Sequence, residues 1–177
     1  MLTFDAQKDF LHRHNVAAMG HTNQTLLDHL TAVRDILAAW GNPPDILAAG
    51  LFHSVYGTES FRQVALPPAL RPAVVEVIGE TAEGLAYTFG AMEKATFDAA
   101  VSRGVDFWVG DRHTGGRILL PESQWRGLCE VVVANWLEQR PRVAPEKKNL
   151  KAEMFRRIRQ WISPSASTAL SAAYGFQ

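Results

Sequence analysis

The stretch from His21 to Phe61 constrains the fold more than any other part of the chain. Between Leu26 and Leu37, apolar residues recur at intervals of three and four, which is typical of a helix with one buried face. Gly41 then predicts a helix end, and Asn42, ahead of a proline pair, predicts the capped start of a second helix. This second helix is apolar at nearly every position from Ile46 to Phe52, so we expect it to be buried on most sides.

A polar cluster interrupts this apolar run at its end. His53, Ser54, Tyr56, Thr58 and Glu59 follow one another within seven positions. Polar groups at the end of a buried helix need hydrogen bonds, a metal ion or a functional role. We therefore expect the functional site here, with His53, Tyr56 and Glu59 as candidates for acid–base chemistry and Ser54 and Thr58 lining the pocket.

Composition narrows the class of protein. Lys plus Arg and Asp plus Glu both number 18, so the charge balance predicts neither nucleic-acid nor anionic-membrane binding. The single cysteine, Cys129, excludes an intramolecular disulfide and fits a reducing compartment. The N-terminal residues lack the apolar run of a signal peptide, and no apolar stretch approaches the roughly 20 residues of a membrane span. We expect one cytoplasmic domain over residues 1–177.

The other helices are predicted from periodicity and from breakers. Residues 3–14 predict an amphipathic helix, and Thr22 or Asn23 is expected to cap the helix that contains Leu26. Between 69 and 102, helical pattern is interrupted at Gly79. There Glu76, Glu80 and Glu83 lie at helical spacing, and we expect a solvated strip, with inward-pointing carboxylates as the alternative.

In the second half of the chain, one segment changes from the apolar spacing of a helix to that of a β-strand. Residues 105–120 predict a β-hairpin, because two β-type runs flank a pair of glycines. Residues 121–140 predict a helix whose buried part carries Asn135, an amide that needs partners. A basic helix is expected at about 145–162, with Leu150, Met154, Ile158 and Trp161 facing inward. A loosely held tail is expected at 164–177.

Three segments together resemble the HD-domain superfamily, most closely the hydrolase module of the Rel/Spo-type guanosine tetraphosphate enzymes. LLDHLTAVRDILAAWG is similar to the first-histidine helix, with His29 at the ligand position. DILAAGLFHSVYGTE is similar to the central motif, with His53 as its histidine. VVVANWLEQR is similar to the last motif, with Asn135 at the final aspartate. The resemblance covers about residues 21–140 and implies an all-α, HD-domain-like helical bundle with one small β-hairpin.

In that superfamily two histidines and two aspartates hold a divalent metal that activates water against a phosphate ester. Here Ser54 and Asn135 stand where the two aspartates belong, so His29 and His53 remain of the four. We expect His21 to complete a metal site, with Glu59, His113 or a carboxylate of the Glu76, Glu80 and Glu83 strip as further candidates. Such a set suits zinc, iron or manganese.

The resemblance and the departures leave three functions open. The first is a metal-dependent hydrolase acting on a small, perhaps phosphorylated, substrate at His29, His53 and Asn135. The second is a non-catalytic HD-like binding or regulatory protein, in which the histidines form a polar core network. The third is an iron-dependent HD-type oxygenase. In each, Arg112 and Gln139 are expected to line the pocket, and the ligand is a small molecule. Four of the tryptophans are assigned to the core or an interface, which leaves a homodimer open.

Overall fold

The computed structural model describes residues 1–21 and 24–176, apart from the side chain of His21, and is mostly helical. Its α-helices are α1 Phe4–Arg13, α2 Leu26–Ala39, α3 Pro44–Phe52, α4 Arg71–Ile78, α5 Glu80–Ala91, α6 Lys94–Arg103, α7 Glu122–Gln139, α8 Ala152–Ile158 and α9 Pro164–Tyr174. Its strands are β1 Gly20–His21, β2 Gln24–Thr25, β3 Trp108–Gly110 and β4 Arg117–Leu119. Single 3₁₀ turns lie at Val16–Ala18, Pro68–Leu70, Arg140–Arg142, Pro145–Lys147 and Arg159–Trp161. In the described residues no helix is long and apolar enough to cross a bilayer.

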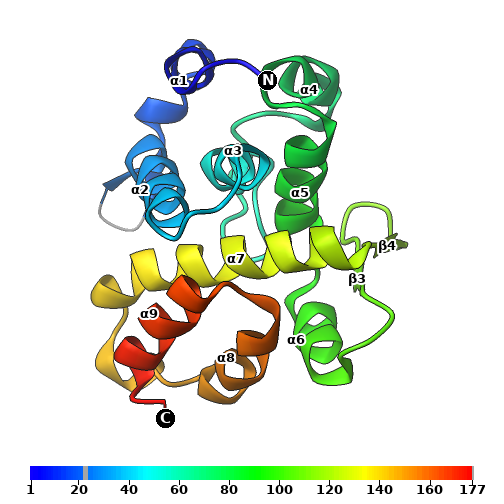
Figure 1. The fold of residues 1–177 in the computed structure, drawn as a ribbon. Coiled ribbons are helices and arrows are strands. Elements are labelled where there is room, and N and C mark those ends of the chain that lie inside the picture. Colours follow the sequence, from blue (N-terminus) through cyan, green and yellow to red (C-terminus); the bar gives the residue numbers. More distant parts are fainter. Residues whose placement is uncertain (22–23, 177) are drawn as a thin grey trace.

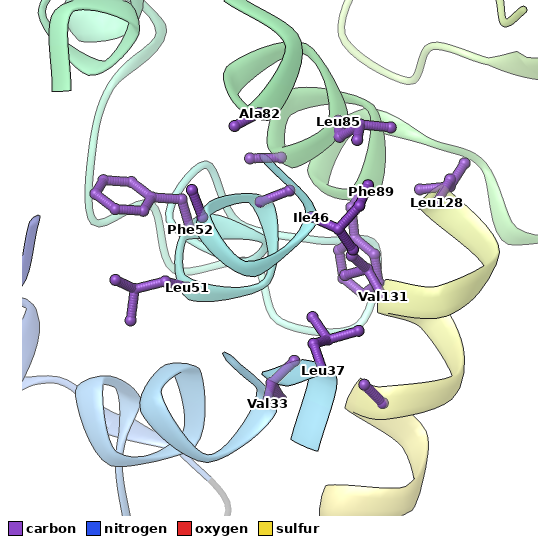
Figure 2. Packing of buried hydrophobic residues seen from close by; sticks show 14 of the residues in the cluster. Val33, Leu37, Ile46, Leu51, Phe52, Ala82, Leu85, Phe89, Leu128 and Val131 are labelled. Carbon is purple, nitrogen blue, oxygen red and sulfur yellow. The ribbon is translucent and has the colours of Figure 1, made fainter. Parts of the chain in front are cut away.

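Helix α3 lies at the centre of the fold, as its apolar sequence predicts. Helices α2, α5 and α7 pack around it. Leu51 and Phe52 of α3 are fully buried, and Figure 2 shows them within a cluster of side chains from all four helices. The long helix α7 crosses the molecule, with α2, α3 and α5 on one side and α6, α8 and α9 on the other (Figure 1).

Local sequence sets the close approach of α2 and α3. Thr25 caps α2 and forms a capping box with Asp28, whereas the expected caps, Thr22 and Asn23, lie outside the described residues. On α3, a Cβ at Gly50 would collide with the side chain of Leu37 on α2. Because Gly50 has no Cβ, the side chain of Leu37 packs directly against the backbone of α3, between the two helices that carry the histidines.

The start of α3 differs from the expectation. Pro43 occupies the N-cap position and makes no side-chain cap. Asn42, the expected cap, instead donates its amide to Glu130 on α7 at 3.0 Å and to the carbonyl of Leu37 at 3.3 Å. Glu130 is buried, and its carboxylate accepts the amide N–H of Asn42, so Asn42 ties the turn before α3 to α7.

The break between α4 and α5 occurs at Gly79, whose φ of 82° is open to glycine but strained for other residues. Of the expected solvated strip, Glu76 and Glu80 are exposed. Glu83 is the correction, since it is buried and accepts two hydrogen bonds from Arg71. The inward alternative therefore holds for one carboxylate of the three.

The predicted hairpin is confirmed by β3 and β4, which pair antiparallel with Trp108 opposite Leu119. Strands β1 and β2 form a second short pair that the sequence did not suggest. The basic helix is shorter than expected, and Leu150 is exposed rather than inward, because α8 begins only at Ala152. Residues 164–174, expected to be loosely held, form α9, which Ser163 caps and which buries Leu170.

Candidate functional site

Two fully buried histidines form the centre of the site. His29 lies on the inner face of α2, and His53 lies at the C-terminal cap of α3. Their Nε2 atoms are 3.1 Å apart, and the rings meet edge to face. The ring of Phe89 on α5 stands edge-on to His53 at 4.7 Å between centroids, so an apolar wall backs the pair.

The other nitrogen of each histidine is anchored from behind. Nδ1 of His53 lies 2.7 Å from the carbonyl oxygen of Gly50, and Nδ1 of His29 lies 2.6 Å from Oε2 of Glu138. A carbonyl oxygen and an ionised carboxylate only accept, so both Nδ1 atoms carry the proton. In metal sites the ligating histidines are held in this way, by a carboxylate or a backbone carbonyl on the far nitrogen.

Glu138 is ionised in this setting. Burial alone would raise the pKa of its carboxyl group, but hydrogen bonds from His29, Arg142 and Gln24 outweigh burial and lower the pKa to about 2. The Arg142 and Gln24 bonds to Oε1 measure 2.6 and 2.9 Å. The carboxylate is thus saturated with donors and fixes the orientation of the His29 ring.

Asn135 on α7 supplies a third polar atom. Its Oδ1 lies 3.1 Å from Nε2 of His53 and accepts a hydrogen bond of 2.7 Å from Gln139, one turn later on the helix. That bond from Gln139 fixes Oδ1, rather than the amide nitrogen, toward the histidine. We call the meeting point of His29 Nε2, His53 Nε2 and Asn135 Oδ1 the junction.

The proton positions determine what the junction can hold. With both Nδ1 atoms protonated, neutral imidazoles direct the lone pairs of both Nε2 atoms to one place, beside the amide oxygen. Acceptors that lie 3.1 Å apart, as His53 Nε2 does from each of the other two atoms, repel unless a donor or a cation lies between them. A proton on His53 satisfies the set, because Nε2–H can then donate to both neighbours at 3.1 Å. A metal ion would satisfy the same three atoms.

The junction also has dimensions that suit a metal. With bonds of about 2.1 Å, adjacent ligands of an ion are about 3.0 Å apart in octahedral and about 3.4 Å apart in tetrahedral geometry. The observed 3.1 Å separations fall in this range. Two imidazoles and an amide oxygen fit zinc or iron(II) better than magnesium. Within the described residues no three His, Cys, Asp or Glu side chains gather as a metal site. The expected third ligand, His21, has its side chain outside them.

A cavity of about 390 Å³ opens beside the junction. Ser54, Asn135 and Gln139 line it from the side of the junction, and Thr58 and Glu59 line it from the loop that follows α3. Ser54 and Thr58 are buried, whereas Glu59 is exposed. The structure therefore brings five of the expected site residues to one pocket, next to the two histidines.

Tyr56 belongs to a different hydrogen-bond network. Its side chain is fully buried, and its hydroxyl donates to Glu83 at 3.0 Å. Burial, with the adjacent Glu83 carboxylate, raises the pKa of Tyr56 far above its ordinary value. Arg71 binds the same carboxylate and stacks on Tyr87. This arrangement suits a structural tie between α4, α5 and the loop after α3.

Three further expected pocket residues lie elsewhere. Glu80 is exposed in the first turn of α5. Arg112 donates to the carbonyl of Gly90 at 3.0 Å and lines a separate surface hollow, and His113 is exposed on the hairpin turn beside Tyr87. None of these three lines the cavity beside the junction.

Two residues of the site were absent from the sequence-based prediction. Glu138 lies three positions after Asn135, so both occupy one face of α7, and this spacing was the available signal. Lys94 also lines the cavity, at the start of α6. A lysine among polar neighbours carries no pattern that separates it from a solvated one.

Neither the curated proteins nor the solved structures contain a match to this chain. One family model does match, over residues 10–94, and its description is a domain of unknown function, DUF6817. The matched segment includes His29, His53 and Ser54 but ends before α7, which supplies Asn135 and Glu138. From α1 to the start of α6, the chain is therefore similar to the DUF6817 family.

Proposed function

We propose that the chain is a metal-dependent hydrolase of HD type, acting on a small, phosphorylated substrate in the cavity beside the junction. The observation that carries the proposal is the convergence of His29 Nε2, His53 Nε2 and Asn135 Oδ1, with both Nδ1 atoms anchored behind them. Rigid histidines of fixed tautomer are what a metal site requires.

A divalent ion held at the junction would supply Lewis-acid chemistry toward a phosphoryl oxygen. The chain's own residues then have distinct tasks. His29 and His53 hold the ion, Asn135 adds a neutral oxygen, and Gln139 fixes that oxygen in place. Ser54 offers a hydroxyl at the cavity wall, and Glu59 is placed to accept a proton at its mouth.

A specific observation also favours a second function, which is binding without turnover. Both positions where the resemblance expects an aspartate carry neutral side chains, Ser54 and Asn135. The carboxylate of Glu138 contacts His29 from behind, at Nδ1, and does not lie at the junction. A weakly held ion, or a proton in its place, would leave a pocket that binds its ligand and releases it unchanged.

Metal analysis of the purified protein tests the proposal. We expect about one zinc or iron per chain in the wild type and in a His12→Ala control, because His12 is exposed on α1. His53→Ala and Asn135→Leu should lose it. Circular dichroism establishes whether the variants are folded. If His53→Ala does not fold, the test rests on Asn135→Leu.

Turnover separates the two functions. The metal-loaded wild type should release phosphate from a panel of phosphomonoesters, and Asn135→Leu should not. A folded wild type that binds no metal, or that binds metal and hydrolyses nothing on the panel, overturns the hydrolase. Ligand binding in that protein would support the second function.

A further inference from the structure

The cavity beside the junction shares a wall with a smaller, more apolar one. The smaller cavity measures about 120 Å³ and lies between α5, α6, α7 and α8. Its apolar lining comes from Phe97, Val132, Met154 and Phe155, and the paired Asp98 and Lys151 also border it; none of these six residues lines the larger cavity. Both cavities are lined by Phe89, Met92, Lys94, Asn135 and Trp136. One ligand can therefore contact both.

Lys94 stands at this shared wall as a cation with no carboxylate in ion-pair contact. Its amino group is half-buried and donates to the hydroxyl of Ser60. In the part of the chain that the structure describes, Lys94 forms no ion pair. The nearby Asp98 is paired with Lys151 at 3.2 Å, and Glu59 is exposed. Burial, with the like charge of Lys151, lowers the pKa of Lys94, and the carboxylates of Glu59 and Asp98 offset only part of this lowering.

A half-buried ammonium is costly unless a negative charge compensates it. In the described residues Glu59 and Asp98 act on Lys94 only from beyond ion-pair distance, so an anionic ligand would supply the close negative charge. The polar cavity on one side of Lys94 offers hydroxyls from Ser54, Thr58 and Ser60 and an amide from Gln139, all suitable partners for anionic oxygens.

The apolar cavity fixes the other half of the ligand. An apolar cavity of about 150 Å³ in a protein interior is known to bind benzene. A space of about 120 Å³ that shares lining residues with a second cavity therefore suits one ring-sized apolar group. Its lining by Phe97, Val132 and Phe155 matches such a group.

We propose that the pocket selects a small organic anion, whose charged group binds between Lys94 and the junction and whose ring-sized apolar group enters the cavity lined by Phe97, Val132 and Phe155. The inference rests on the proposed function for the location of the pocket and names its substrate class. Binding itself needs no bound metal.

Calorimetric titration with phenylphosphonate, which is not hydrolysed, tests this directly. With the full chain, phenylphosphonate should bind at least tenfold more tightly than inorganic phosphate or benzyl alcohol. Lys94→Met should weaken binding at least tenfold, which corresponds to about 1.4 kcal/mol. Val132→Phe, which fills the apolar cavity, should reduce the affinity for phenylphosphonate to that for phosphate. Lys147→Met is the control, because Lys147 is exposed and lines neither cavity.

The inference is overturned if phenylphosphonate binds no better than phosphate, or if the folded Lys94→Met or Val132→Phe protein binds it like the wild type. These outcomes are distinct from failure of the proposed function. If the protein is metal-free and inactive but binds phenylphosphonate through Lys94, the hydrolase proposal is refuted and the proposed ligand class is retained. If the protein is a metal-loaded hydrolase whose affinity for phenylphosphonate is unchanged by Lys94→Met and Val132→Phe, the hydrolase proposal stands and the ligand class is refuted.

Discussion

Replacing Glu138 with glutamine tests the contact that orients the His29 ring from the side opposite the junction. The carboxylate receives hydrogen bonds from His29 at 2.6 Å, Arg142 at 2.6 Å and Gln24 at 2.9 Å. These lower its pKa from 4.5 to about 2. A difference of about 2.5 at 1.36 kcal/mol per pH unit is about 3.4 kcal/mol. Solvent screens the half-exposed Arg142, so we expect Glu138→Gln to lower the free energy of unfolding by about 2 kcal/mol at pH 7.

The sign of the pH dependence follows from the lowered pKa. Because the carboxyl group is more acidic folded than unfolded, its contribution is complete above the unfolded pKa of 4.5 and is lost as the pH falls through the folded pKa of about 2. The stability gap between wild type and Glu138→Gln should therefore be constant from pH 6 to 8 and narrow below about pH 4.5. Urea unfolding, followed by tryptophan fluorescence at several pH values, measures it.

The same substitution should weaken metal binding. Loss of a carboxylate partner behind a ligating histidine typically costs 10–100-fold in affinity. Glu130→Gln is the matched control, since Glu130 is also buried on α7 but bonds Asn42 and the backbone of Ser163. We expect it to lose stability and keep its affinity for zinc in a chelator competition. If both variants lose zinc equally, or if Glu138→Gln loses none, the reasoning about the junction is refuted.

Three other outcomes are expected. Tyr56→Phe should lower the free energy of unfolding by about 2 kcal/mol, since it removes a hydrogen bond to a buried carboxylate, yet leave turnover unchanged; a fall in kcat in the folded variant would restore a catalytic role. Lys94→Met should unfold at higher urea concentration than the wild type, because it removes a half-buried charge, and an unchanged or lower midpoint would contradict this. Cys129, fully buried and with a raised pKa, should react with Ellman's reagent only after unfolding.

The central helices were predictable because the burial of apolar surface dominates their formation. The period of the apolar residues in α2, and the almost uninterrupted apolar run in α3, leave few ways to remove that surface from water. The hairpin was predictable for a different reason, since Gly115 has a φ of 71° that the turn requires. In these segments local pattern and burial agree, so sequence alone suffices.

The site was only partly predictable, because its polar residues are matched across distant helices. Glu138 meets His29 over 109 positions, and apart from its spacing of three from Asn135 no local pattern distinguishes it from the exposed Glu122 on the same helix. Tyr56 lies three residues beyond His53, but its hydroxyl donates to Glu83 because Arg71 holds that carboxylate in reach. Leu150 fits a helical stripe that does not form, since α8 begins after it. For Glu138 and Tyr56, the role of the side chain depends on which distant residue it contacts, and residue type alone does not reveal that partner.

The placement of the negative charge bears on what the junction can do. In the pattern that the chain resembles, carboxylates face the metal, whereas here Ser54 and Asn135 are neutral and the charge of Glu138 lies behind the His29 ring. A carboxylate on Nδ1 makes Nε2 of the same ring a stronger donor to a cation, so part of the lost attraction is restored through the imidazole. Among the described residues no carboxylate replaces the two aspartates at the junction itself, and the wall of the cavity carries Lys94 and, at its mouth, Glu59. An anionic ligand would bring the negative oxygens that the chain does not place there, so the ion and the ligand should each bind more tightly when the other is present.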